Sequence, residues 1–166
     1  MSSVEPAFRS KALVWLPDPD YVDVIVRPLP RGATTDPTAW LRATFDVRRS
    51  PAWLKALFGL RQAVVPLLGI ERSPRDRFAI QQVGAEEALT HASERHLDFA
   101  AALGVDAEQH LVRLTTTVRL HGWRGRVYFL PVRLAHRTIA GAMLRRAARA
   151  LSTADAAPER QGTPSP

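Results

Sequence analysis

The feature that most constrains the fold is a change of period near residue 121. From Gln109 to Leu120 the side chains alternate between a largely apolar set and a polar one. The first set is Val112, Leu114, Thr116, Val118 and Leu120; the second is Arg113, Thr115, Thr117 and Arg119. This alternation predicts a strand of an antiparallel sheet with one buried and one solvent-exposed face. From about Trp123 to Leu151 the apolar spacing is helical, which predicts one long helix with Pro131 in its first turns or at a kink.

Earlier strands are predicted where β-branched and apolar residues run between turn signals. The segment Tyr21–Arg27 is β-branched, and Pro28 ends it. Three further runs, joined by short connections, continue the sheet: Phe78–Val83, Glu87–His91 and Arg95–Leu103. Because the connections are short, we expect the later strands to form an antiparallel meander.

Two helices are predicted between the first strand and the meander. Asp36-Pro37 combines a preferred N-cap with proline at the first helical position, and this helix extends to about Phe45. Ser50-Pro51 repeats the signal and begins a helix with a wide apolar stripe from Trp53 to Leu68. The fold class is therefore α+β, with a curved antiparallel sheet whose apolar face is covered by the long C-terminal helix.

Length and composition favour one domain. The chain has 166 residues, which we divide into an N-terminal extension (1–17), a single domain (18–151) and a Pro-rich tail expected to be disordered (152–166). There is no cysteine, so disulfides and thiolate metal sites are excluded and a reducing, cytoplasmic location is expected. The sequence predicts neither a signal peptide nor a transmembrane segment of about 18 apolar residues.

The basic residues are spread along the chain. The net charge is +7, and all the basic residues except Lys11 and Lys55 are arginines, mixed with 16 acidic residues. Nucleic-acid binding needs cations that converge on one groove or stripe. We therefore expect no specific nucleic-acid partner, and only weak electrostatic binding to polyanions.

Several segments carry a family resemblance: Trp53–Arg61 followed by Leu67–Gly69, then Arg95–Phe99, then Thr115–His121 continuing to Tyr128 and His136-Arg137. They resemble the bacterial domain-of-unknown-function 2867 family, over roughly residues 20–150. The element order also resembles the START-like helix-grip (SRPBCC) superfamily, which implies a curved sheet gripping the C-terminal helix around a cavity. The family offers no established activity or site. Its members also occur behind short-chain dehydrogenase domains, but this sequence has no glycine-rich dinucleotide fingerprint.

The residues expected to line such a cavity are aromatic or ionisable. Pockets for small molecules are mostly apolar, with a few placed polar groups. On this basis the candidate ligand-binding residues are Tyr128, His136, Trp53 and Trp123. Ordinary core packing is the competing interpretation of each of them.

His96 and Asp98 form a possible polar pair. They lie two residues apart on a predicted strand and so share a face, as a base and its orienting carboxylate would. The favoured interpretation is structural: both side chains point outward, and Asp98 meets Arg113 or Arg119 across the ladder. The histidines do not fall at metal-ligand spacing, so we expect no metal and no cofactor, and no residue is assigned a catalytic role.

These observations rank three functions. The leading one is a binding domain for a small apolar ligand held between the sheet and the C-terminal helix. The first alternative is a cyclase- or hydrolase-type enzyme in the same cavity, with His96 or His136 as acid or base. The second is a peripheral binder of anionic lipid or nucleic acid that uses the arginines.

Overall fold

The computed structural model of the protein describes residues 10–46, 80 and 82–154. The predicted helix over 53–68, half of the predicted strand over 78–83 and the tail from residue 155 lie outside the described residues. Everything below concerns the described part of the chain.

The sheet is antiparallel throughout, with the strand order β1-β5-β4-β3-β2. Its strands are β1 (Tyr21–Pro28), β2 (Gln82–Val83), β3 (Glu87–Ser93), β4 (Leu97–Asp106) and β5 (Leu111–Leu120). The last four pair in sequence order, which confirms the predicted meander. The first strand pairs with the last one, with Ile25 opposite Leu114, so β1 forms one edge of the sheet.

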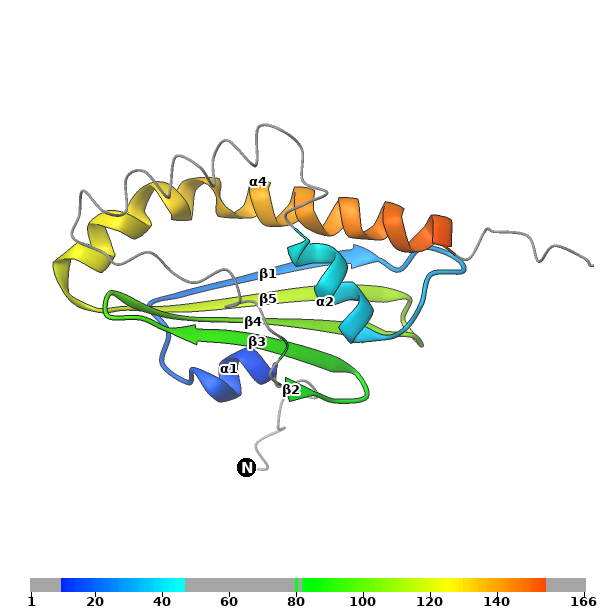
Figure 1. Cartoon of the computed structure of the whole chain (residues 1–166), viewed down its shortest axis with the longest axis horizontal. Coiled ribbons are helices and arrows are strands. Elements are labelled where there is room, and N and C mark those ends of the chain that lie inside the picture. Colours follow the sequence, from blue (N-terminus) through cyan, green and yellow to red (C-terminus); the bar gives the residue numbers. More distant parts are fainter. Residues whose placement is uncertain (1–9, 47–79, 81, 155–166) are drawn as a thin grey trace, which may run out of the picture.

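Two helices, α2 (Pro37–Phe45) and α4 (Gly122–Ala154), cover one face of the sheet (Figure 1). The N-cap predicted at Asp36 is confirmed, because its carboxylate accepts from the Thr38 and Ala39 backbone N–H groups at 2.8 and 3.2 Å. Arg146 of α4 ties the helices together by donating to the carbonyls of Ala43 and Thr44. Trp40 and Leu41 of α2, Leu103 and Leu114 of the sheet and Leu144 of α4 are buried in the shared core.

The long C-terminal helix is confirmed, and it continues to Ala154, slightly past its predicted end. Pro131 lies inside it, and its axis changes direction in the N-terminal third, drawn in yellow (Figure 1). The first turns pack closely on the sheet: a Cβ at Gly125 would collide with the His96 carbonyl oxygen. This contact fixes where the helix begins its path across the sheet.

The other face of the sheet is not open to solvent along its length, so the prediction of one wet face is wrong. A short helix, α1 (Lys11–Trp15), packs on it, and Thr115 and Thr117 of β5 are buried there. The Thr117 hydroxyl donates to the Ala12 carbonyl at 3.3 Å. A threonine in an alternating strand predicts a solvent-facing position, but Thr117 is buried with its hydroxyl paired to this backbone acceptor.

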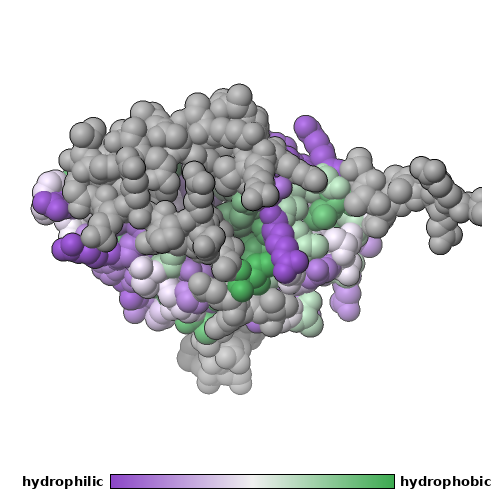
Figure 2. Space-filling view, viewed as in Figure 1, coloured by the Kyte–Doolittle hydropathy of each residue, from purple (hydrophilic) through white to green (hydrophobic). Residues whose placement is uncertain are grey.

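The predicted register of β5 is otherwise correct. Val112, Leu114 and Val118 are buried, whereas Leu120, at the strand end, is only partly buried. Arg113 and Arg119 lie on the α1 side and are partly rather than fully exposed. Side chains of both kinds mix on the described surface seen in Figure 2, with the most hydrophobic patch near the position of α2.

Candidate functional site

The candidate site begins on β1, whose alternation divides its side chains between the two faces of the sheet. Tyr21, Asp23 and Ile25 point toward α4. The intervening valines point to the opposite face and are exposed: Val22, Val24 and Val26. Asp23 is only 8% exposed. Burying a carboxylate to this degree is costly unless charges and hydrogen bonds compensate. The residues around Asp23 therefore show how its charge is stabilised.

Two successive residues of α4 supply the ionisable neighbours of Asp23. Arg137 Nε lies 3.3 Å from Asp23 Oδ1, and His136 Nε2 lies 3.8 Å from Asp23 Oδ2. The Arg137 side chain is mostly exposed, so it covers the carboxylate from the solvent side. Thr116 of β5, which is buried, stands opposite Asp23 in the strand register and adds a hydroxyl group on the same face.

The facing atoms of Asp23 and His136 are the chemically open part of the cluster. Asp23 Oδ2 and His136 Nε2 are both buried, and neither has a hydrogen-bond partner among the described residues. Their separation of 3.8 Å is too long for a direct hydrogen bond. Buried polar atoms are nearly always paired, so this arrangement suits a third polar atom that hydrogen bonds to both.

Aromatic side chains form the wall beside this cluster. The Tyr21 ring packs edge-on against Phe129 at 5.1 Å and against the His136 imidazole at 5.5 Å. Burial lowers the pKa of His136, with the Asp23 charge opposing the shift. Burial and the Asp23 charge raise the pKa of Tyr21. At neutral pH the site therefore presents a neutral imidazole and a phenol hydroxyl beside a carboxylate.

The model of one protein family of unknown function, DUF2867, matches residues 15–143 of this sequence. The chain belongs to the DUF2867 family. The match includes β1 and the part of α4 that carries His136, so the cluster lies within the family region. No curated protein and no solved structure matches the chain.

In this DUF2867 member, no helix among the described residues is long and apolar enough to cross a membrane. The same part of the chain contains no group of three or more His, Cys, Asp or Glu side chains arranged to hold a metal ion.

His96 is not where the sequence analysis placed it. It was expected to point outward, but it is buried, and its ring lies edge-on to Tyr128 of α4 at 5.3 Å. The expectation is wrong because β4 begins at Leu97, so His96 belongs to the preceding turn and does not follow the strand alternation. In that turn His96 Nε2 lies 3.2 Å from Glu94 Oε2.

Asp98 lies on the opposite face from His96, so the two do not form a pair. It stands opposite Arg119 in the register, as expected, but its ion pair is with His121, at 3.1 Å. The Arg119 side chain instead donates to the Asp18 carbonyl. Asp98 therefore belongs to the other face of the sheet and takes no part in the cluster at Asp23.

The four candidate ligand-binding residues have different locations. His136 is in the cluster at Asp23, whereas Tyr128 is buried earlier on α4, against Leu97 and Val132. Trp123 is 67% exposed, with the Arg124 guanidinium over its ring, so it does not line the interior of the described structure. Trp53 lies outside the described residues.

Sequence reasoning missed the residues that β1 contributes. Asp23 and Tyr21 were included in a β-branched strand and were not considered as site residues. The sequence did contain a signal. Asp23 shares its face of the strand with Tyr21 and Ile25, whose side chains are largely apolar, so this face is expected to be buried and Asp23 with it.

Proposed function

We propose that this protein binds a small molecule between the sheet and α4, with the polar part of the ligand at Asp23 and His136. The observation that supports this most directly is the pair of buried, facing atoms, Asp23 Oδ2 and His136 Nε2, which lack hydrogen-bond partners among the described residues. A hydroxyl or amide group between them would satisfy both. The proposal follows from the rule that buried polar atoms are paired.

The surroundings favour a ligand that is mainly apolar. Tyr21, Phe129 and Ile25 lie beside the polar cluster and offer aromatic and aliphatic contacts. The pairing of the first and last strands, and the long C-terminal helix that crosses the sheet, support a START-like helix-grip assignment. We include this superfamily assignment in the proposal, and fold alone would not indicate a ligand.

The test is native mass spectrometry of protein purified from its own host. The wild-type chain should retain a small molecule, and the double variant Asp23→Asn/His136→Ala should lose it. Asp98→Asn is the matched control, because Asp98 is a partly buried, ion-paired carboxylate on the other face of the sheet. Equal retention by the double variant and by Asp98→Asn would contradict the proposed location. If the wild-type protein neither retains nor binds any small molecule, the proposed function is wrong.

An enzymatic role of the cyclase or hydrolase kind has one observation in its favour. Burial keeps His136 neutral near pH 7, and Asp23 stands beside it, so the imidazole is able to take a proton from a bound substrate. In that case His136→Gln should retain the ligand but lose turnover of it, as followed by mass spectrometry of the released product. Conversion of the ligand by His136→Gln at the wild-type rate would show that His136 is not the acid or base, and no conversion by the wild-type protein would leave binding as the function.

A further inference from the structure

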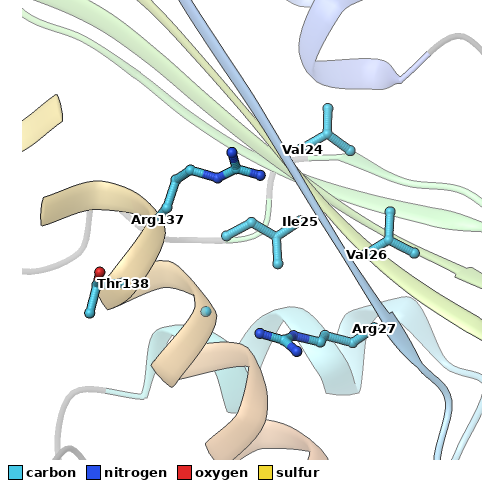
Figure 3. Close-up of a pocket in the computed structure, with 7 residues that line it drawn as sticks. Val24, Ile25, Val26, Arg27, Arg137 and Thr138 are labelled. Atoms are coloured by element: carbon cyan, nitrogen blue, oxygen red, sulfur yellow. The ribbon is translucent and has the colours of Figure 1, made fainter. Parts of the chain in front are cut away.

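A groove runs between the edge strand β1 and α4, beside the cluster at Asp23 (Figure 3). Its volume is about 340 Å³, and its lining residues are Val24, Ile25, Val26, Arg27, Arg137, Thr138 and Gly141. Figure 3 shows Ile25, Arg27 and Arg137 directed into the gap between strand and helix, while Val24 and Val26 point away from the helix. The groove therefore has a small apolar floor and cationic sides.

Two guanidinium groups approach each other at Gly141, which lines this groove. A Cβ built on Gly141 would lie 3.4 Å from Arg145 Nη1 and 3.8 Å from Arg27 Nη2. The first arginine is on α4 and the second is on β1, so the tertiary fold brings them together. The absence of a side chain at Gly141 leaves the space between them open.

The two guanidinium groups are exposed and carry the same charge. Like charges this close repel each other, and neither Arg27 nor Arg145 has an ion pair or hydrogen bond within the described part of the chain. The third cation, Arg137, is already paired with Asp23. An oxyanion at the point above Gly141 would contact both free guanidinium groups, and arginine recognises carboxylates and phosphates in this way.

The strand edge adds possible donors. Within the described residues β1 pairs only with β5, so the backbone N–H groups on its other edge are unpaired and lie beside the groove. Backbone N–H groups and arginines together are a common way to hold an oxyanion.

We propose that the groove at Arg27, Arg145 and Gly141 is a binding site for a small anionic group, a carboxylate or a phosphate. The site is separate from the proposed ligand position at Asp23, and either can exist without the other.

The test measures binding of inorganic phosphate and of malonate by calorimetry at constant ionic strength. We expect saturable binding of at least one of them, and the stronger one identifies the class. Arg27→Gln and Arg145→Gln should each weaken it about tenfold or more, as loss of a charged hydrogen bond implies. Arg126→Gln, an exposed arginine elsewhere on α4, should leave the affinity unchanged.

Gly141→Ala provides an independent variant that keeps every charge. Alanine is a better helix former than glycine, so the chain should still fold, while the methyl group projects into the space between the two guanidinium groups. We expect the affinity to fall as in the arginine variants. Unaltered affinity in Gly141→Ala, or no saturable binding of either anion by the wild-type protein, would overturn the proposal.

Polyanions are a separate arm of the experiment. Vesicles containing anionic lipid and a single-stranded oligonucleotide should bind no more tightly than phosphate or malonate does. Binding of either polyanion that depends on Arg27 and Arg145, without binding of the small anions, would overturn the small-anion site in favour of a surface contact. The variants that lose phosphate binding should still show the retained ligand in the native mass spectrum, so the two proposals fail independently.

Discussion

At the scale of single residues, the chemistry is concentrated where β1 meets α4. Asp23 and His136 are far apart in the sequence, and each is unremarkable there. In the fold the carboxylate becomes buried and the imidazole becomes its neighbour at 3.8 Å. The two side chains together create a polar environment inside an otherwise apolar interface, and this environment has a measurable signature in the dependence of stability on pH.

The free energy of unfolding should fall as the pH falls below about 6.5, in part because of His136. Burial lowers its folded-state pKa, so below the ordinary histidine pKa of 6.5 the unfolded chain takes up a proton that the folded chain resists. This contribution to stability is complete above pH 6.5 and is lost as the pH falls toward the folded pKa. Burial also lowers the pKa of His91, which is stacked on Trp15, so its contribution to stability changes with pH in the same direction.

Urea unfolding at pH 7.5 and 5.5 measures the effect. The loss from one such group is at most about 1.4 kcal/mol per pH unit. His136→Gln should reduce the difference between the two pH values, whereas His110→Asn, at an exposed turn position, should not. An equal difference in wild type and His136→Gln would show that His136 is not linked to folding.

At the scale of elements, the two glycines of α4 that face other parts of the protein have opposite roles. Gly125 is required because the His96 carbonyl occupies the position of a side chain, and this contact seats the helix on the turn before β4. Gly141 faces the groove, where a methyl group would make only close or ordinary contacts with the flexible ends of arginine side chains. The same residue type therefore serves packing at one end of the helix and open space further along it.

Alanine substitutions at these positions should change stability in opposite directions. Gly125→Ala should lower the free energy of unfolding by about 1–3 kcal/mol, because a backbone carbonyl must move to admit the methyl group. Gly141→Ala should raise it by up to about 1 kcal/mol through helix propensity. Chemical denaturation of both variants checks this, and a neutral Gly125→Ala would mean that the contact with His96 is easily relieved.

Elements were predictable from the sequence where one local signal decides them. The Asp36-Pro37 cap and the change of period near residue 121 each depend on a few adjacent residues, and both were predicted correctly. α1 was not predicted, because its short run has no helical period, and it is stabilised by contacts with the sheet, such as Ser10 with Glu87. The cluster at Asp23 could not be predicted from the sequence for a similar reason, because it depends on which strand lies beneath which turn of α4.

At the scale of the whole molecule, the positive charge is dispersed. Arginines lie on β1, β5, α2 and α4 in the described part of the chain, and several are committed to carbonyls or carboxylates of the fold, as Arg119, Arg137 and Arg146 are. A net charge of +7 attracts polyanions from a distance. It does not by itself provide the continuous track that tight nucleic-acid binding uses.

Binding to DNA or to anionic vesicles should therefore be micromolar or weaker, and should vanish near about 0.15 M salt, as expected when counterion release is the main source of affinity. Fluorescence anisotropy with a labelled duplex, and co-sedimentation with anionic vesicles, measure this over a range of salt concentrations. Sub-micromolar, sequence- or lipid-selective binding at about 0.15 M salt would instead favour the peripheral binder.

The pairing of the first strand with the last one determines when the protein can be completed. Tyr21 pairs with Val118, so most of the chain must emerge from a ribosome before β1 finds its neighbour. At about 5–20 residues per second this is a wait of several seconds, during which the valine-rich segment has no partner strand. The α4 residues that meet Asp23 emerge later still. The candidate site is therefore assembled at the end of folding, and newly made chains should be most prone to aggregation just before they can bind anything.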